Sequence, residues 1–452
     1  MELIYEVIIH GFLIGVLILG VFHARRSTVD SYTAQTNKVS VLSLVATLVG
    51  TSFGGGVIVG MVTMGFEAGV VGVIVAASYF LGFIVLALLA GKIRSALGKN
   101  NRSLLDYLEQ IYGLAVRKTA ALIFSVVLFL FASAQFVALA SFIHYFFEVG
   151  FYVAIIASAA YLIIYTALGG FRSVLLTDKL QFFLMLITSV LLVGPVLITQ
   201  SPVDSLKTLP SDMLDGTAYG LVFLAGAILF LWPTLLARID IWQRIRSARS
   251  LSVVRKAFTI SGFVIFLSFS FFTVVGMLAR AHGGLEAETA IFQYVELMLP
   301  EYGMTVVFLA ILAAVMSSGD SILNVLAISV SDLFQGRSQN STAINNKQKL
   351  LKLRIATVIV GIITVVVAFV FPDIVDLNIG GISTVLIFVV PIIAGLFGWR
   401  LSSRVVLISI ISGFAVIVAA FPFMPTEAFV PGFVVSLLVL IGGHFLTRRK
   451  LT

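Results

Sequence analysis

Long apolar stretches separated by short polar segments run through almost the whole chain. Most of them reach about 20 residues, the length that a helix needs to cross the hydrocarbon core of a bilayer. The pattern predicts an all-α, multi-pass protein of the cell membrane, with one integral membrane domain over residues 1–452. The thirteen predicted spans are 4–22, 41–64, 70–92, 117–145, 149–169, 178–200, 217–238, 257–281, 303–334, 353–371, 376–398, 403–422 and 428–447.

The first span has the length of a signal peptide but not its flanks. It begins "MELIYE", with two acidic residues and no basic one, and it continues into the basic segment "HARRS". A cleaved signal needs a basic start and a small-residue cleavage site. We therefore expect a retained extra helix with its N-terminus outside.

The basic residues support this orientation. With the N-terminus outside, 27 of the 29 Lys and Arg residues fall on the cytoplasmic side, and only Lys207 and Arg280 fall outside, whereas 14 of the 21 acids are external. Lys and Arg in short loops set the orientation of membrane proteins. The pattern therefore predicts a cytoplasmic C-terminus, and the net charge of +8 is interpreted as an orientation signal rather than a nucleic-acid footprint.

Composition excludes several other functions. Residues are 60% hydrophobic and only 11% charged, where a soluble domain carries about 25% charged residues. The absence of cysteine excludes thiol chemistry and Cys-ligated metals, and the five histidines are scattered. No phosphate-binding loop of the G-x-x-x-x-G-K-[ST] type occurs, so ATP-driven transport is disfavoured. The bilayer is the expected environment, and no obligate protein partner is evident.

The second span contains a glycine-rich weak point, "GTSFGGGVIVG", at residues 50–60. Each glycine inside a helix costs about 1 kcal/mol relative to alanine, so Gly54–Gly56 favour a broken helix that lines a cavity. Close helix packing through Gly56 and Gly60 explains the glycines about equally well. The stretch also spells G-x-S-x-G around Ser52, but no strand–turn–helix context or partner base supports a hydrolase.

The ninth span contains a polar cluster, "AAVMSSGDSILN", at residues 313–324. Helical spacing places Ala314, Ser317, Ser321 and Asn324 on one face, with Ser318 and Asp320 beside them. Hydroxyl and carboxylate oxygens suit small hard cations. A single serine is more simply explained by hydrogen bonding to its own helix, but a buried Asp costs about 2.5–3.5 kcal/mol on insertion scales and indicates function.

A second acid, Asp178, opens the sixth span in "TDKLQFFLM". It is explained either as a helix cap or dipole partner, with Lys179 beside it, or as part of a cation site. This single position does not decide between the two.

Several segments together resemble the sodium/solute symporter family, which includes bacterial proline, sugar and sialic acid symporters. The resemblance covers nearly the whole chain. Its most specific blocks are "YTALGGFRSVLLTDKLQFFLM" and "AAVMSSGDSILNVLAISVSDLF", supported by "SLLDYLEQIYG", "IDIWQRIRSAR" and a degraded counterpart in "STVDSYTAQTNKVS".

The resemblance implies a LeuT-type core of five-plus-five inverted repeats, at 41–200 and 217–398, followed by two C-terminal helices at 403–447. It also implies Na⁺ as the coupling ion. Carried over residue by residue, the main Na⁺ site comprises Gly50, Phe53, Ala314, Ser317 and Ser318, and a possible second Na⁺ site comprises Asp178, Ser317, Ser321 and Asp320.

By the same resemblance, the solute lies beside the unwound parts of two broken helices. The candidate contacts are Ser52, Gly54, Gly55, Ser78, Tyr79, Ser133, Gln135, Trp232, Thr234, Ser383 and Thr384. Apolar residues around Val57 disfavour a monosaccharide, and an amino acid-like or carboxylate solute is weakly favoured.

The sequence therefore predicts a Na⁺-coupled symporter that imports a small organic solute by alternating access and is not an enzyme. Two alternatives remain open. One is a proton-coupled symporter in which Asp178 or Asp320 carries the proton, and the other is a transporter-like membrane sensor.

Overall fold

The computed structural model describes residues 10–15, 18, 39–52, 54–98, 103–164, 166–168, 202–335, 346–399, 401–425 and 427–448. Within these residues the fold is all-helical, with a single isolated β-bridge between Val39 and Ala248. The bridge ties the segment before the first long helix to a loop more than 200 positions later in the chain.

The helices of the first half are α3 (Val41–Ser52), α4 (Gly55–Ala68), α5 (Val71–Leu97), α6 (Leu104–Tyr112), α7 (Leu114–Phe147) and a further helix, Phe151–Leu168. The middle of the chain forms α9 (Pro202–Leu206), α10 (Ser211–Asp215), α11 (Gly220–Gly226), η1 (Ala227–Leu231), η2 (Trp232–Ala237), α12 (Ile239–Ser247), α13 (Leu251–His282), α14 (Ala290–Met298) and α15 (Glu301–Gln335). The last part forms α16 (Asn346–Val370), α17 (Ile374–Thr384), η3 (Val385–Phe388), α18 (Val389–Leu396), α19 (Ser403–Ala420) and α20 (Phe429–Arg448).

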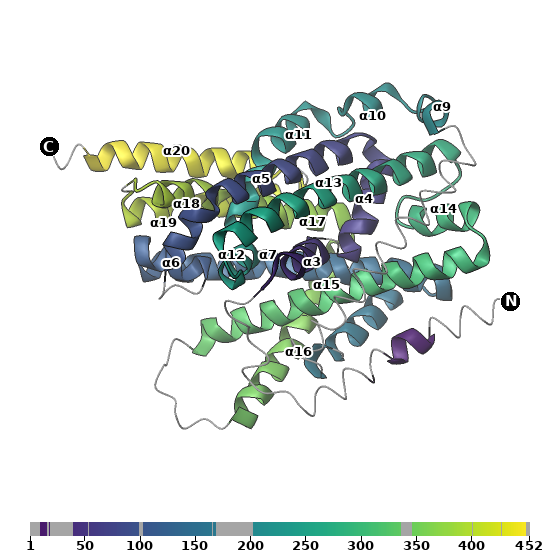
Figure 1. Ribbon diagram of the computed structural model, residues 1–452, viewed down its shortest axis with the longest axis horizontal. Helices are drawn as coiled ribbons and strands as arrows, with labels where there is room; N and C mark the ends of the chain where they lie inside the picture. The colour runs from purple at the N-terminus through teal and green to yellow at the C-terminus, as the bar shows by residue number, and fades with distance from the viewer. Residues whose placement is uncertain are drawn as a thin grey trace.

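Ten helices within the described residues are long and apolar enough to cross a membrane, and the bent pair α3–α4 makes an eleventh. These spans correspond to eleven of the thirteen predicted from the hydropathy pattern. The other two predicted spans, 4–22 and 178–200, lie mostly or wholly outside the described residues. In Figure 1 the long helices α5, α13 and α15 run along the horizontal axis.

The predicted break in the second span is confirmed. Val41–Ser52 and Val57–Ala68 meet at an angle of 52°. Gly54 caps the start of α4 with its backbone alone, because a glycine has no side chain to offer. Close packing is seen at Gly60, where an ideal Cβ meets a methyl carbon of Ile374 on α17 at 3.1 Å, whereas the surroundings of Gly56 lie outside what the structure describes.

A second irregular span runs over Ser211–Ala237. Its α-helical part ends at Gly226, a π-helical turn follows, and a 3-10 helix begins at Trp232. Pro233 sits in the first turn of that 3-10 helix, where its missing N–H breaks the regular hydrogen-bond ladder. Residues of both broken spans line the same cavities, Ser52 and Gly54 with Thr234 in one of them.

The broken span is held against α13 by glycines. A Cβ on Gly65 would collide with the backbone carbonyl of Thr273, and one on Gly276 would collide with that of Val62. Small residues let two membrane helices approach until their backbones touch. The contact places α4 firmly against α13, and α13 packs along α5 on its other side.

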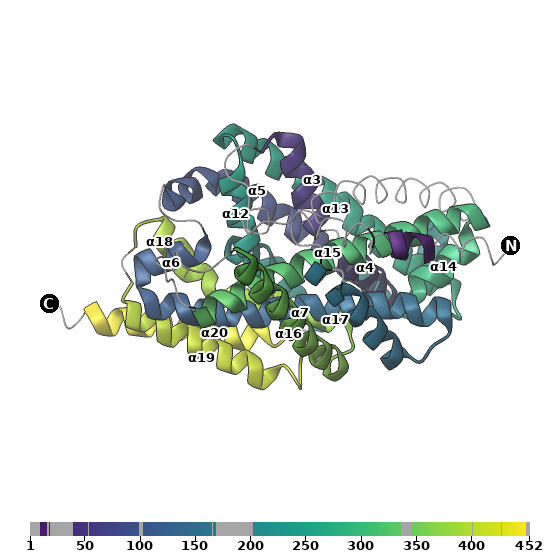
Figure 2. The same cartoon turned by 90° about the horizontal axis from the view of Figure 1, so that it is seen from below.

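Short helices cover one end of the bundle. α6 begins at Ser103, whose hydroxyl accepts a hydrogen bond from the Asp106 N–H at 3.3 Å, and it ends at Gly113 with φ 85°. Its apolar face, with Leu104 and Leu108, is buried. Figure 2 shows α6 beside α18, at the opposite end of the molecule from α14.

Candidate ion and solute site

The break between α3 and α4 lies directly against α15. An ideal Cβ on Gly54 falls 2.6 Å from the Ser318 Oγ and 3.2 Å from the Gln135 Oε1. Three elements far apart in the sequence, the break, α7 and α15, therefore meet at this point. Only a glycine fits at position 54 without moving Ser318.

Ser318 is the most informative of these residues. It is 2% exposed, and its hydroxyl has no hydrogen-bond partner among the described residues. Leaving a buried hydroxyl unpaired costs about 1–3 kcal/mol. Serines elsewhere in the helices, such as Ser125 and Ser141, bond to the carbonyl four residues earlier in their own helix. An oxygen held this way is suited to ligate a cation.

Other predicted ion ligands flank Ser318. Gly50 is buried in the last turn of α3, where backbone carbonyls lack intrahelical donors and the helix dipole is negative. Ala314 is buried one turn before Ser318, and Ser321 lines the cavity described below. Phe53 lies outside the described residues, and so does the side chain of Ser317.

The two predicted acids are placed differently. Asp178 lies outside the described residues. Asp320 is 1% exposed and close enough to Tyr161, on the helix Phe151–Leu168, to act on it electrostatically. It does not line the cavity that Ser318 and Ser321 face.

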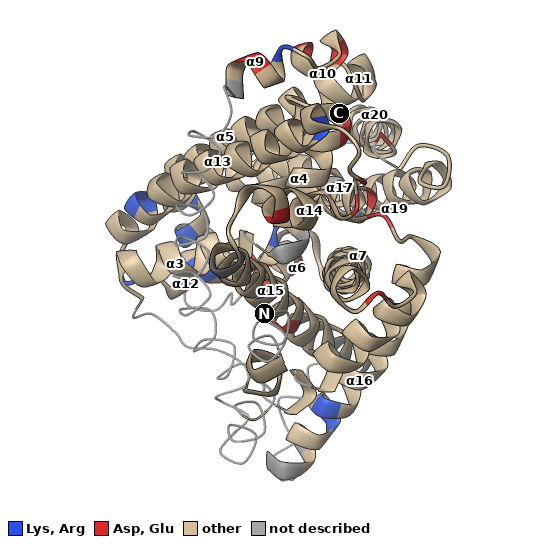
Figure 3. Ribbon diagram, turned by 90° about the vertical axis from the view of Figure 1, so that its right-hand side faces the viewer, with Lys and Arg blue, Asp and Glu red and all other residues tan. Residues whose placement is uncertain are grey.

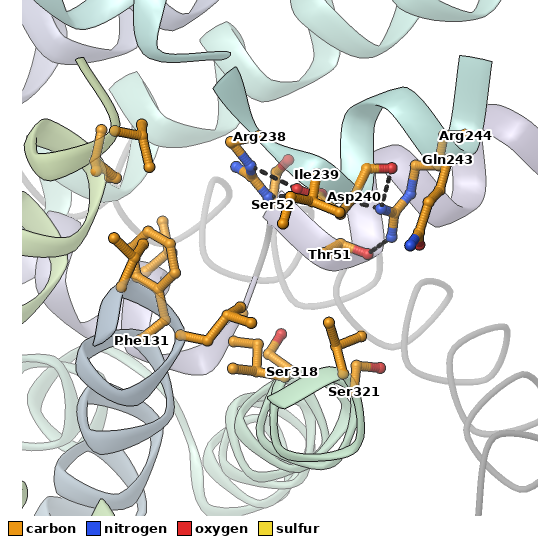
Figure 4. A pocket seen from close by; sticks show the side chains of 18 of the residues that line it. Thr51, Ser52, Phe131, Arg238, Ile239, Asp240, Gln243, Arg244, Ser318 and Ser321 are labelled. Atoms are coloured by element: carbon orange, nitrogen blue, oxygen red, sulfur yellow. Dashed lines mark hydrogen bonds and ion pairs between the residues drawn. The ribbon is translucent and has the colours of Figure 1, made fainter. Parts of the chain in front are cut away.

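A cavity of about 300 Å³ opens beside the break. This is the lower end of the range for small-molecule sites in proteins. Figure 4 shows Ser318 and Ser321 on one wall and Arg238, Asp240 and Arg244 on another. Five of the predicted solute contacts line it: Ser52, Gly54, Tyr79, Gln135 and Thr234.

The remaining predicted contacts lie elsewhere or face other helices. The Ser78 hydroxyl donates to the Ala227 carbonyl at 2.8 Å, and the Ser133 hydroxyl contacts the Thr364 carbonyl at 3.0 Å. Thr384 donates to the Gly380 carbonyl of its own helix at 2.6 Å. None of these three, nor Trp232, lines the cavity. Gly55 begins α4, but its surroundings, like the side chain of Ser383, lie outside what the structure describes.

Charged residues at the cavity mouth were not among the predicted contacts. Arg238 binds Asp240 through two nitrogens, at 3.0 and 2.9 Å, and Arg244 binds the same carboxylate at 2.9 Å. Arg244 also donates to the Thr51 hydroxyl on α3. The segment "RIDIWQR" indicated part of this network, because Asp240 and Arg244 are four residues apart in α12 and can pair, whereas Arg238 precedes the helix and is not at helical spacing.

Asp240 and the arginines that bind it stay ionised. Burial opposes ionisation of the Asp240 carboxyl, but Arg238 and Arg244 outweigh this effect and lower its pKa. Burial likewise disfavours the charged form of Arg238, but the charge of Asp240 more than compensates and raises its pKa. Both arginines at the cavity mouth are thus engaged by Asp240.

Asn378 on α17 also lines the cavity and was not predicted. Its side-chain nitrogen donates to the Ile374 carbonyl at 3.0 Å. As an amide within a predicted membrane span, it could have been singled out by its polarity. Within the described residues, no three His, Cys, Asp or Glu side chains cluster as metal ligands. A cation at this site would therefore be bound by hydroxyl and backbone carbonyl oxygens.

Comparison with known families decides the relationship. The model of the family described as "Sodium:solute symporter family" matches residues 32–413, well over half of the chain. The chain belongs to the sodium:solute symporter family. It is accordingly a multi-pass membrane transporter with Na⁺ as the coupling ion, and not an enzyme.

Solved structures agree on the fold of this symporter. A structure titled "Substrate-bound outward-open state of a Na+-coupled sialic acid symporter reveals a novel Na+-site" matches with a TM-score of 0.78 and 19% identity, over 98% of this chain and 97% of that one. Mhp1, a nucleobase-cation-symport-1 family transporter, matches in a closed conformation with bound bromovinylhydantoin with a TM-score of 0.56 and 14% identity, over 93% and 96% of the chains. Mhp1 in its inward-facing conformation matches with a TM-score of 0.57 and 13% identity, over 92% of each chain. The comparison with curated protein sequences gives no match.

Proposed function

We propose that this symporter imports a small organic solute, amino acid-like or carboxylate, and that Na⁺ binds between the break in α3–α4 and the hydroxyls of α15. The observation that supports this most directly is the contact of Gly54 with Ser318, whose buried hydroxyl has no partner among the described residues. The ion is held by Gly50, Phe53, Ala314, Ser317 and Ser318. A second Na⁺ is held by Asp178, Ser317, Ser321 and Asp320.

A carboxylate solute fits the start of α4. Gly54 supplies no side-chain cap, and its carbonyl already accepts from the N–H groups of Val57 and Ile58 at 2.7 and 3.0 Å. The preceding N–H groups of α4 stay available, and the positive end of the helix dipole favours an anion. Gln135, Tyr79 and Asn378, with Thr234, provide polar contacts around it. The similar Na⁺-coupled sialic acid symporter is described with a novel Na⁺ site. Its solute is a carboxylate, so this similarity supports both a carboxylate solute and a second Na⁺ for this chain.

The cavity extends toward α12 and the segment before α3, which supports an inward-facing arrangement. Val39, Gln243 and Ser247 line its far end. The basic loops predict that this end is cytoplasmic, with the N-terminus outside and thirteen spans in all. Acidic residues gather at the other end, on α9 and α10, as Figure 3 shows. In alternating access, Na⁺ and solute each bind one conformation better, which couples their transport.

Uptake by the purified protein in liposomes tests the proposal. Labelled amino acids, monocarboxylates and sugars are offered with an inward Na⁺ gradient, and with choline replacing Na⁺ at constant pH. We expect Na⁺-dependent accumulation of one amino acid-like or carboxylate solute. Uptake that follows a proton gradient in choline would support the proton-coupled alternative. Ligand binding without any uptake would support the sensor alternative.

A further inference from the structure

A groove separate from the solute cavity lies among α5, α6, the start of α13 and the end of α18. Its volume is about 570 Å³. Lys92 from α5 and Arg255 from α13 line it, with Ser95 and Gln110 as further polar side chains. Neither cation is in a salt bridge with a described residue. Two cations from different helices therefore converge on one groove with no acid among its lining residues.

Tyr107 provides a buried polar group at the base of this groove. Its side chain lines the groove and is 3% exposed, yet its hydroxyl has no hydrogen-bond partner among the described residues. Burial raises the pKa of Tyr107, with a smaller contribution from Tyr112, so the hydroxyl keeps its proton and can donate. The ring is fixed by contact with Trp242, their centroids 5.0 Å apart. The Tyr107 hydroxyl is itself buried, so the groups that the groove offers to a phosphate oxygen are the cations of Lys92 and Arg255.

The surroundings of the groove are apolar on one side. Leu88 also lines it, lies one helical turn before Lys92 on α5, and is 71% exposed. The Lys92 ammonium lies 4.4 Å from the centre of the Phe397 ring, and Trp399, two residues further on, is 61% exposed. Exposed Trp residues at span ends are typical of the membrane–water interface. The groove therefore passes from an apolar, lipid-facing wall to a basic end within one turn of helix.

We propose that this groove binds an anionic phospholipid, with the headgroup phosphate held by Lys92 and Arg255 and one acyl chain lying along Leu88. The end of the molecule that carries the groove is the one that the basic loops predict to be cytoplasmic, where anionic lipids attract Lys and Arg. A soluble phosphate compound shares the headgroup chemistry but leaves Leu88 without a role. The bound lipid joins α5, α6, α13 and α18.

The proposal also connects the lipid with the transport machinery. The Tyr107 ring contacts Trp242 of α12 in a tilted arrangement, and the neighbouring α12 residues Asp240 and Gln243 line the solute cavity. An ideal Cβ on Gly395 falls 2.6 Å from the Tyr107 hydroxyl, so α18 is in close contact too. A lipid in the groove thus lies beside Tyr107, a residue in contact with α12, without touching the predicted ion ligands.

The test counts lipids bound to the full chain by native mass spectrometry, as phosphatidylglycerol or phosphatidylcholine is added to protein purified in neutral detergent. We expect the wild type to retain phosphatidylglycerol in preference to phosphatidylcholine. Lys92→Gln with Arg255→Gln should weaken phosphatidylglycerol binding about thirtyfold, at about tenfold per 1.4 kcal/mol and about 1 kcal/mol for each cation.

Lys256→Gln is the matched control, because Lys256 follows Arg255 on α13 and is exposed but does not line the groove. It should bind phosphatidylglycerol like the wild type. In a second arm, inorganic phosphate competes with phosphatidylglycerol at equal concentration, and we expect little displacement. Wild-type lipid binding by the Lys92/Arg255 double variant would overturn the proposal, as would equal losses in Lys256→Gln. Displacement by inorganic phosphate at equal concentration would overturn the assignment to a lipid.

Discussion

At the scale of single residues, the site depends on an unusually close contact between a glycine and a serine. Gly54 fits against Ser318 because it has no Cβ, and the Ser318 hydroxyl is buried beside the break. Neither residue type is diagnostic alone, because glycines and serines are common in membrane helices. Their contact brings two distant parts of the chain together at the place where we propose that the ion binds.

Replacing Ser318 with alanine should weaken Na⁺ binding. Loss of one oxygen ligand is expected to raise the Na⁺ concentration for half-maximal thermal stabilisation about tenfold, which corresponds to about 1.4 kcal/mol. The measurement is a thermal-shift titration of the purified protein with Na⁺ balanced by choline. Ser141→Ala is the control, because the Ser141 hydroxyl bonds to Val137 of its own helix and does not line the cavity. An identical Na⁺ response in both variants would remove Ser318 from the ion site.

Gly54→Ala should be more harmful than Gly50→Ala. A Cβ at position 54 would press on the Ser318 Oγ at 2.6 Å, and such overpacking costs about 1–3 kcal/mol. At Gly50 the new methyl meets no described atom within 4 Å, and the backbone carbonyl is kept. We expect Gly54→Ala to lose Na⁺-dependent uptake while Gly50→Ala retains it. Equal uptake by the two variants would contradict the fit at the break.

At the scale of elements, α12 is tied to α3 by charge. Asp240 accepts from Arg238 and Arg244, and Arg244 reaches Thr51 at the end of α3. The Val39–Ala248 bridge joins the same two regions through the backbone. These contacts hold the end of the broken span at the cavity mouth.

Asp240→Asn should loosen this connection. The arginines would lose their charge partner, and we expect a loss of about 2 kcal/mol, since the pair is only partly buried. A lower denaturation midpoint in detergent, with faster proteolysis near α12, is the expected readout. Asp204→Asn is the control, since Asp204 and Lys207 are both 70% exposed and exposed pairs contribute little. A midpoint no lower than that of Asp204→Asn would show that the network does not hold α12.

The effect of pH on the same network follows from the lowered pKa of Asp240. A carboxyl whose pKa is lower in the folded state stabilises the fold above its unfolded pKa, about 3.9. This stabilisation is lost only as the pH falls through the lowered folded value. Near neutral pH the wild type should therefore show no titration of this network.

The spans were predictable from sequence because a helix in lipid must be long and apolar, which leaves a strong pattern. The break at Gly54 and the oxygen-rich face of α15 followed from local composition. The sequence indicated only some of the polar residues that line the cavity, such as Gln135 and Thr234. Ser78 and Ser133 bond to neighbouring helices instead, and Asn378 and Asp240 reach the cavity through packing between distant segments. Such contacts leave no periodic signal.

At the scale of the whole molecule, the cavity opens toward one end and the charges are divided between the two ends. The chain contains no cysteine, so when a single cysteine is introduced, any labelling by a thiol reagent occurs at that position. Gln243 lies at the cavity mouth, and Lys207 lies on the acidic end near α9. These positions allow orientation and access to be measured together.

We expect Gln243→Cys to react with a membrane-impermeant maleimide only from the cytoplasmic side, and Lys207→Cys only from outside. Na⁺ together with the solute should change the rate at Gln243→Cys and leave Lys207→Cys unaffected. Labelling is followed in right-side-out and inverted vesicles. Reaction of Gln243→Cys from outside would refute the proposed orientation.

The contact between α4 and α13 has a mechanical consequence. With glycines at 65 and 276 the two backbones touch, so neither helix can rotate or slide past the other without steric conflict. α13 has 32 residues and is thus a rod of about 48 Å. A tilt of about 5° around its middle displaces each tip by about 2 Å. We therefore expect a small tilt of α4 to be carried along α13 to both of its ends through this contact.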